Sequence, residues 1–263
     1  LTCIGIPKTV DNDLPVTDCS PGFVSVAKYI ATSTMEAGLD VKSMSETSTK
    51  VFILEVMGRH AGWIAAASAL ASTNETDPPH IILMPEVPFA KKNFIDKVKQ
   101  TVANEGFCVV VASEGTRYKN GMFLADSGLT DAFGHKQLGG VAPVLAQMIS
   151  SIGLKNHWAV SDYLQRSARH ISSKTDLDQA YAVGKKAVEF ALAGKNAVMP
   201  VIKRLSNKPY KWKIEAASLS KVANVEKTLP KGYISKDGFK ISSKGIDYLA
   251  PLIQGEPPLE FKN

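Results

Sequence analysis

The sequence predicts an α/β fold in which mainly parallel sheets are flanked by helices. Three short apolar runs, at residues 51–56, 81–84 and 107–112, have the length and composition of buried strands. Segments with helical spacing of apolar residues lie between them. Strands and helices therefore alternate along the chain, as an α/β layer fold requires.

Composition limits the class of protein without choosing one. A chain of 263 residues with 44% hydrophobic content can bury a sizeable core, and its length permits one or two domains. No apolar run approaches the roughly 20 residues of a membrane span and no signal-peptide pattern is present, which favours a cytoplasmic protein without a membrane partner. The net charge of +6 comes from scattered lysines, many of them near acids. This charge fits solubility and attraction of anionic substrates better than nucleic-acid binding.

Helices are expected wherever apolar or small residues recur with helical spacing. Pro143 would lie in the first turn of its helix, where proline is tolerated, and Gly194 would end the last helix. The expected helices cover residues 22–37, 64–70, 93–104, 141–151 and about 175–193.

The remaining stretches are less regular. Residues 197–202 indicate a further strand, and Pro200 indicates an edge or irregular position for it. Residues 113–117 form a polar exit from a buried strand, which fits a plain loop and a binding contact equally well. Residues 116–140 are rich in glycine and charge and indicate a loop or an insertion. After residue 203 the chain is lysine-rich and loosely patterned, so peripheral helices and loops are expected there.

Residues 7–13, Pro-Lys-Thr-Val-Asp-Asn-Asp, are the most informative stretch of the chain. In an extended segment Thr9, Asp11 and Asp13 would point the same way, because side chains alternate with a period of two. Such a cluster suits metal-assisted phosphoryl transfer: the hydroxyl contacts the moving group, one carboxylate takes a proton and the other holds Mg²⁺. Asp and Asn are also ordinary turn residues, so the heptapeptide alone fits an acidic turn equally well.

A second cluster follows the buried run at residues 51–56. Met57-Gly58-Arg59 lies at a strand-to-helix turn, where open α/β sheets place their ligands. Gly58 leaves the backbone bare at this turn, and Arg59 could grip a phosphate with its fixed guanidinium. The alternative is a surface arginine at a helix start. For His60 a packing role at the helix start is favoured over catalysis.

Together these residues resemble the phosphofructokinase family. Residues 9–13 differ from the family's Thr-Ile-Asp-Asn-Asp only by valine for isoleucine, and residues 55–59, Glu-Val-Met-Gly-Arg, repeat its sugar-phosphate segment unchanged. The family's Pro-Glu-Val stretch stands at residues 85–87 and its Gln-Arg pair at residues 165–166. The resemblance therefore rests on four blocks in family order, spread over about residues 1–200.

The resemblance implies a phosphotransferase with two similar lobes around a cleft. It would transfer a phosphoryl group to the 1-hydroxyl of fructose 6-phosphate, with Mg²⁺, and give fructose 1,6-bisphosphate. Asp11 matches the base that accepts the hydroxyl proton, Thr9 a contact to the phosphoryl group, and Asp13 the Mg²⁺-linked carboxylate. Arg59 matches a residue placed to neutralise charge in the transition state.

The resemblance also assigns contacts to fructose 6-phosphate. They comprise a segment that seats the sugar, an acid that binds its hydroxyls, and a tyrosine and an arginine that bind its 6-phosphate. Lys50 matches a basic residue that the family lends to the 6-phosphate of a neighbouring subunit, which implies a homodimer or homotetramer. The matching positions are, in that order, Met57, Gly58 and Arg59, then Glu86, then Tyr163 and Arg166.

Lys8 helps to distinguish between pyrophosphate and ATP as the phosphoryl donor. Typical bacterial ATP-dependent members have glycine here, whereas pyrophosphate-dependent members have lysine, whose ammonium could fill nucleotide space and attract a small polyanion. Thr9 would share the donor contact, and the His-Ala-Gly-Trp continuation at residues 60–63 also resembles the pyrophosphate-using branch. Plant-type ATP-dependent members carry lysine too. The resemblance favours pyrophosphate as the donor and leaves ATP as the alternative.

By resemblance the chain crosses between the two lobes. Residues 1–22 and 166–202 would belong to the phosphoryl-donor lobe, and residues 23–165 with 203–263 to the fructose 6-phosphate lobe. The family's first strands and Gly-Gly-Asp donor segment have no counterpart here, so the chain is expected to be part of a longer polypeptide. A further alternative is a non-catalytic regulatory subunit. Such a subunit would be expected to lose the hydroxyl and carboxylates of residues 9–13, and all are present.

Overall fold

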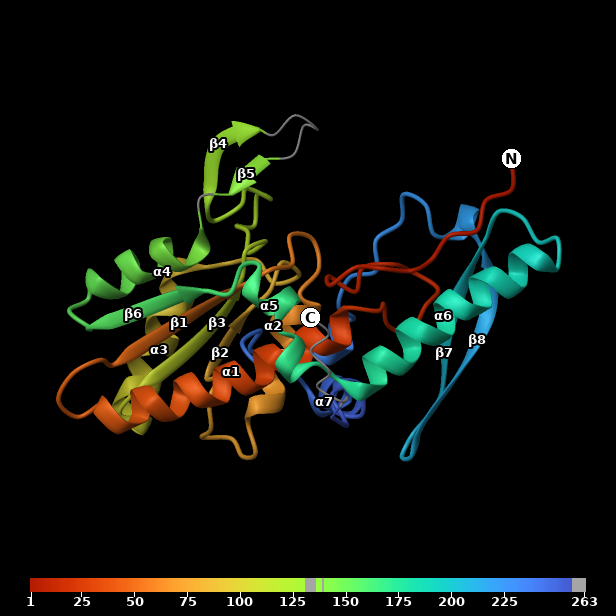
Figure 1. Ribbon diagram of the computed structural model, residues 1–263. Helices are drawn as coiled ribbons and strands as arrows, with labels where there is room; N and C mark the ends of the chain where they lie inside the picture. Colours follow the sequence, from red (N-terminus) through yellow and green to blue (C-terminus); the bar gives the residue numbers. More distant parts are fainter. Residues whose placement is uncertain (131–135, 139, 257–263) are drawn as a thin grey trace, which may run out of the picture.

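The computed structural model describes residues 1–130, 136–138 and 140–256 of the chain (Figure 1). These residues form two regions. The larger is a parallel sheet covered by helices, and the smaller combines a long helix with an antiparallel hairpin. The predicted α/β class, with a parallel sheet between helices, is confirmed. The C-terminal tail at residues 257–263 lies outside the described residues.

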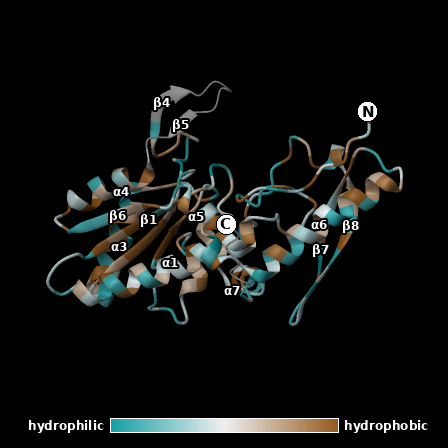
Figure 2. Ribbon diagram, in the orientation of Figure 1, coloured by the Kyte–Doolittle hydropathy of each residue, from teal (hydrophilic) through white to brown (hydrophobic). Residues whose placement is uncertain are grey.

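The sheet of the larger region has four parallel strands in the order β2-β3-β1-β6. The three predicted strands are confirmed, and their side chains are largely buried on both faces of the sheet. Sequence reasoning misses β6, whose side chains are mostly exposed and therefore form no apolar run. Figure 2 shows this contrast, with β1 and β3 mainly brown and part of β6 teal. The strands are β1 (Val51–Val56), β2 (Ile81–Leu83), β3 (Cys108–Ser113) and β6 (Asn156–Val160).

Helices cover both faces of this sheet. Because side chains alternate along a strand, Leu54 and Val56 face a core shared with α1 and α2. Val51 and Ile53 face a second core, shared with α3 and α4. The predicted helices are present, although the first continues further than expected. They are α1 (Phe23–Met44), α2 (Trp63–Ala67) with the 3₁₀ turn η1 (Ser68–Ala71), α3 (Lys91–Glu105) and α4 (Val141–Ser150).

The smaller region contains helix α6 (Lys174–Leu192) and the antiparallel hairpin of β7 (Val198–Asn207) with β8 (Tyr210–Ser218). The predicted helix and strand are confirmed. Strand β7 continues past residue 202, however, and β8 follows it, so the expectation of only helices and loops after 203 is wrong. The missed signal was the alternation of lysine with aromatic and aliphatic residues over 210–214. The lobe boundary expected after residue 202 falls inside β7.

Two helices have N-terminal N–H groups satisfied by distant carboxylates. Glu55, in β1, accepts a hydrogen bond from the Ala142 N–H of α4 (2.7 Å). Asp176, in α6, accepts from the Gly22 N–H (2.9 Å) and the Ser25 N–H (3.1 Å) at the start of α1. A carboxylate is favoured at a helix N-terminus because it complements the free N–H groups and the helix dipole. Asp176 thereby ties the smaller region to the larger one.

Residues 116–140, expected to be a loop or an insertion, contain a second antiparallel pair, β4 (Asp126–Thr130) with β5 (Lys136–Leu138). Figure 1 shows this pair projecting from the sheet region. In the described part of the chain, no helix is long and apolar enough to cross a membrane. The remaining elements are α5 (Leu164–Ser167), α7 (Ser243–Leu249) and the 3₁₀ turns η2 (Arg169–Ile171), η3 (Leu219–Lys221) and η4 (Lys231–Tyr233).

Candidate active site

The predicted catalytic segment, residues 7–13, runs between the two regions. Thr9 forms an isolated parallel bridge with Gly22, and a turn follows at once. The expectation of an extended segment is wrong, because Asn12 adopts a left-handed backbone conformation with φ of 55°. Asparagine tolerates this conformation better than most residues. The turn, rather than strand alternation, sets the directions of Asp11 and Asp13.

Asp11 and Asp13 line one cavity, of about 320 Å³, together with residues from three other loops. Arg59 follows β1 and Glu114 follows β3, so both come from the carboxyl edge of the parallel sheet, where such sheets bind ligands. Thr9 does not line this cavity. Its hydroxyl oxygen instead accepts a hydrogen bond from the Asp11 N–H (3.1 Å). The complete lining is Asp11, Asp13, Arg59, His60, Glu114 and Glu226.

The acids of this cavity influence one another. The pKa of Asp11 is raised from 3.8 to about 6, chiefly by burial and also by the neighbouring charges of Asp13 and Glu114. The positive charges of His60 and Arg59 oppose this shift. Burial also raises the pKa of Glu114. Asp11 is therefore a stronger base than an ordinary aspartate and still ionises below neutral pH.

The turn that carries Arg59 is fixed by its backbone. Gly58 has a φ of 124°, and a Cβ atom there would lie 2.6 Å from the Ala61 carbonyl oxygen. Its N–H donates to Glu114 Oε1 (3.3 Å) and its carbonyl accepts from the Ser113 hydroxyl. The requirement for glycine at this predicted position is thus steric. The hydrogen bonds also join the turn to the loop after β3.

Sequence reasoning left two lining residues without a role. Glu114 was part of a stretch that fitted a loop and a binding contact equally well, and its place at the end of a buried parallel strand was the available signal. Glu226 comes from the irregular segment after β8, and no motif marks it. Its Oε1 lies 2.5 Å from His60 Nδ1, so His60 pairs with an acid in the cavity instead of packing into the helix start.

The predicted sugar contact Glu86 is engaged by the backbone. Its Oε1 accepts hydrogen bonds from the Gly62 N–H (2.9 Å) and the Leu229 N–H (2.8 Å). Its Oε2 is buried and makes no hydrogen bond within the described residues. A carboxylate oxygen without a partner is available for a hydroxyl donor once that donor reaches it.

The predicted 6-phosphate contacts lie on another element. Tyr163 is exposed, and the Arg166 guanidinium lies 4.1 Å from the centre of its ring. Neither residue lines the acidic cavity. Gln165, between them, is buried and accepts a hydrogen bond from the Met57 N–H (3.3 Å). This bond ties the short helix α5 to the turn after β1.

Two predicted lysines lie apart from the cavity. Lys50 directly precedes β1, so the length of the strand, about 20 Å for six residues, separates it from the turn at Met57. Its ammonium donates to the Ser45 carbonyl oxygen. Lys8 is exposed, and its ammonium has no hydrogen bond or ion pair within the described residues. Lys8 stands beside Thr9 in the catalytic segment.

Comparison with known proteins identifies the family. The family model described as "Phosphofructokinase" matches residues 1–191. The chain belongs to the phosphofructokinase family.

Three similar proteins share the sequence or the fold. The chain is 65% identical to the pyrophosphate–fructose 6-phosphate 1-phosphotransferase of Halomonas elongata and 59% identical to that of Xanthomonas campestris pv. campestris, each over 263 residues. Each alignment covers 99% of this chain and 63% of the relative. The crystal structure of a pyrophosphate-dependent phosphofructokinase from Marinobacter aquaeolei matches with a TM-score of 0.90 at 59% identity, over 100% of this chain and 63% of that one. This phosphofructokinase chain thus spans 63% of the length of all three.

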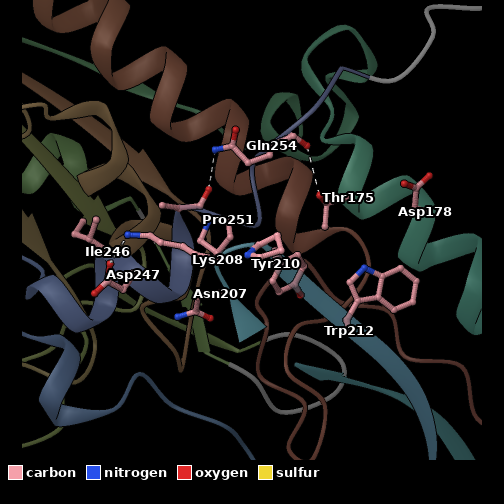
Figure 3. Close-up of a pocket in the computed structure, with 12 residues that line it drawn as sticks. Thr175, Asp178, Asn207, Lys208, Tyr210, Trp212, Ile246, Asp247, Pro251 and Gln254 are labelled. Atoms are coloured by element: carbon pink, nitrogen blue, oxygen red, sulfur yellow. Dashed lines mark hydrogen bonds and ion pairs between the residues drawn. The ribbon is translucent and has the colours of Figure 1, made fainter. Parts of the chain in front are cut away.

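A larger cavity, of about 710 Å³, lies elsewhere in the phosphofructokinase chain, between α6, the turn of the β7–β8 hairpin and α7 (Figure 3). Tyr210, Trp212 and Pro251 form part of its wall, and Lys208 lies 3.9 Å from Asp247 beside it. None of the predicted site residues lines this cavity. Three of the predicted residues, Asp11, Asp13 and Arg59, line the smaller, acid-lined cavity instead.

The carboxylates of that smaller cavity fit a magnesium ion. In the described residues, no group of three or more histidine, cysteine, aspartate or glutamate side chains forms a complete metal site. Mg²⁺ does not need one, since one or two carboxylates usually bind it together with substrate phosphates and water. Asp13 meets this requirement, because it lines the cavity beside Asp11 and its charge already raises the pKa of Asp11. A cation there would relieve the repulsion.

Proposed function

We propose that the protein transfers a phosphoryl group from pyrophosphate to the 1-hydroxyl of fructose 6-phosphate, giving fructose 1,6-bisphosphate in glycolysis or gluconeogenesis. The observation that carries this proposal is the convergence of Asp11, Asp13 and Arg59 on one cavity. The names of the Halomonas, Xanthomonas and Marinobacter proteins support pyrophosphate as the donor.

Asp11 accepts the proton of the sugar hydroxyl as the new phosphate ester forms. With a pKa of about 6 it is ionised at neutral pH and is also basic enough to act as a general base. Thr9 serves the transferring group. Its oxygen accepts the Asp11 N–H, which leaves its own O–H free to donate to a phosphoryl oxygen. Arg59 stabilises the negative charge on that group in the transition state.

Asp13 is the residue that would hold Mg²⁺. This ion, when bound, neutralises charge on the donor phosphates. Lys8 contributes a second positive charge on the donor side, from an exposed position next to Thr9. A compact ammonium suits a small polyanion such as pyrophosphate.

The sugar phosphate is seated by the turn of Met57, Gly58 and Arg59. Glu86 accepts a hydrogen bond from a sugar hydroxyl at its unpartnered Oε2, which is buried in this structure and becomes uncovered when the sugar binds. Tyr163 and Arg166 bind the 6-phosphate from the exposed start of α5. The Met57 N–H donates a hydrogen bond to Gln165 in α5, and this bond fixes the 6-phosphate contacts relative to the turn that seats the sugar.

Lys50 serves a different site from that of its own chain. Lys50 lies directly before β1, whereas the turn that seats the sugar lies directly after β1. The Lys50 ammonium is therefore at the opposite end of the sheet from the cavity of its own subunit. It would reach the 6-phosphate of a neighbouring subunit in a homodimer or homotetramer. The protein would act in the cytoplasm.

The site and the fold support a division of the chain into two lobes. Residues 1–22 and 166–218 form the part of the phosphoryl-donor lobe that this chain contains, which extends the sequence-based boundary to the end of the hairpin. Residues 23–165 and 219–256 form the fructose 6-phosphate lobe. Asp11 and Asp13 then come from one lobe, and Arg59 and Glu114 from the other.

The experiment that tests the proposal is phosphorylation of fructose 6-phosphate by the full-length protein with Mg²⁺ and either pyrophosphate or ATP. We expect activity with pyrophosphate alone. Activity with ATP alone would leave the chemistry in place and replace the donor. Activity with neither, combined with retained binding of fructose 6-phosphate, would contradict the proposal and favour a regulatory subunit.

A further inference from the structure

The ammonium group of Lys227 binds the end of the catalytic segment, at Asn12, and the residues that follow it, up to Asp18. An ammonium has three N–H donors, and the Lys227 Nζ has three acceptors: Asn12 Oδ1 (3.3 Å), the Thr17 carbonyl (3.0 Å) and the Asp18 carbonyl (3.0 Å). The Trp63 ring closes the remaining side, with its centre 5.2 Å from Nζ. No donor is left for a substrate, so Lys227 is not a phosphate-binding lysine.

We propose that Lys227 is a positioning residue that holds the catalytic segment in the turn by which Asp11 and Asp13 reach the cavity. This inference rests on the proposed function and adds to it a residue from the irregular segment after β8. Lys227 itself does not line the cavity.

Asn12 is the point at which Lys227 acts. Asn12 lies between the two functional acids and has the left-handed φ of 55°, a conformation that persists only where the surroundings enforce it. Its buried side chain accepts hydrogen bonds from the Lys227 ammonium and from the Ser20 N–H (3.0 Å). If these bonds are lost, the turn is free to relax toward ordinary backbone angles and the acids on either side move with it.

The main chain of Lys227 reinforces its side chain. Its N–H donates to the Asp13 carbonyl oxygen (2.7 Å), and its carbonyl accepts from the Trp63 indole N–H (2.8 Å). The same residue therefore touches the catalytic segment from the side chain and from the backbone. Its anchor, Trp63, begins helix α2, directly after the turn that carries Arg59.

The neighbours of Lys227 contact other parts of the same site. Glu226 enters the cavity and pairs with His60. The Leu229 N–H donates to Glu86 Oε1 (2.8 Å). Residues 226–229 thus join the catalytic segment to the sugar-binding side. Burial lowers the pKa of Lys227 to about 8, so a charged group is kept in this place at a cost in stability, as expected of a functional position.

The test compares Lys227→Met with Lys231→Met in the full-length protein. Lys231 is exposed, lies in the same segment and makes no contact with the site within the described residues, so its variant is the matched control. We expect Lys227→Met to lower kcat by about 10- to 100-fold, because small misplacement of reacting groups has effects of this size. The KM for fructose 6-phosphate should change by less than about threefold. Lys231→Met should resemble the wild type.

A second variant, Asn12→Ala, keeps the inference testable if Lys227→Met does not fold. Among the described residues it removes the one side-chain acceptor of the ammonium, since the other two acceptors are backbone carbonyls, and it should lower kcat in the same way. The double variant should lose less than the sum of the two single losses, because the contact between Asn12 and Lys227 is lost in both single variants.

The outcomes separate this inference from the function on which it rests. An inactive wild type would overturn the proposed function. An active wild type with kcat unchanged in Lys227→Met or in Asn12→Ala would overturn only the role of Lys227, as would fully additive losses in the double variant.

Discussion

The sheet region and the catalytic segment are stabilised in different ways. Both faces of the sheet are covered by apolar cores, in which residues such as Ile53 and Phe94 are completely buried. The catalytic segment and the residues that follow it, up to Asp18, depend on directed polar contacts instead. The two carboxylate oxygens of Asp18 share the N–H of Arg204 Nε (2.9 and 3.1 Å), and the backbone carbonyl of Asp18 accepts a hydrogen bond from the Lys227 ammonium.

The two kinds of contact have different effects: apolar burial mainly stabilises the fold, and polar contacts mainly position the groups of the site. Apolar burial is proportional to area and has no direction, so it stabilises the fold without fixing an atom to within a fraction of an ångström. Polar networks cost desolvation and contribute less net stability, but they define one arrangement of the groups. Substitutions in the sheet core should therefore change mainly the free energy of unfolding. Substitutions in the polar network should change both stability and kcat.

The largest stability effect is expected from Phe94→Ala in α3. The side chain is completely buried and packs against Phe89, with ring centres 5.5 Å apart. Its truncation should lower the free energy of unfolding by about 3–5 kcal/mol in denaturant titrations. The exposed Lys99→Ala on the same helix should have little effect. The kcat of the folded Phe94→Ala protein should stay close to that of the wild type. A large fall in kcat of the folded protein would contradict the proposed difference between the sheet region and the polar network.

A smaller loss of stability, with a loss of activity, is expected from Asp18→Asn. The substitution leaves the largely buried Arg204 guanidinium without its carboxylate, which should lower the free energy of unfolding by about 3 kcal/mol. The kcat should fall too, because the backbone carbonyl of residue 18 holds the Lys227 ammonium and should shift when the side chain loses its pairing with Arg204. Glu215→Gln is the control, since it breaks an exposed pair with Lys213 (2.7 Å) and should change the free energy of unfolding very little. Equal effects of the two variants would contradict the account.

The smallest effect concerns a polar group within the sheet region. His80 Nδ1 accepts the Val109 N–H (2.9 Å), and burial lowers the pKa of His80 from 6.5 to about 4. Between these values the unfolded chain binds more protons than the folded one, so acid destabilises the fold. The wild type should lose about 2 kcal/mol more than His80→Asn between pH 7 and pH 5. Parallel losses in both proteins would show that His80 does not titrate in this way.

Burial also explains which parts of the fold could be predicted. The strands at 51–56, 81–83 and 108–113 were evident because their side chains are buried on both faces and leave apolar runs. Strand β6 at the sheet edge and the hairpin strand β8 were missed. Many of their side chains are exposed and can be polar, so these strands leave no continuous apolar run in the sequence.

The candidate site was predictable where it coincides with motifs. Asp11, Asp13 and Arg59 were named from short segments, and the structure brings all three to one cavity. Glu226 and Lys227 could not be predicted, because their roles depend on contacts between residues far apart in the sequence. Glu226 pairs with His60, more than 160 residues away, and Lys227 binds Asn12, more than 200 residues away. Local patterns contain no information about such a contact.

The most direct test of the account is the kinetics of Asp11→Ser in the full-length protein with pyrophosphate, Mg²⁺ and fructose 6-phosphate. Because Asp11 is the proton acceptor, kcat should fall by about 10²- to 10⁴-fold. The affinity for fructose 6-phosphate, measured by calorimetry, should stay within about threefold of the wild type. Asp40→Ser, at an exposed position on α1, is the matched control and should leave both unchanged. Turnover of Asp11→Ser close to that of the wild type would remove Asp11 from the mechanism and contradict the assignment of the site.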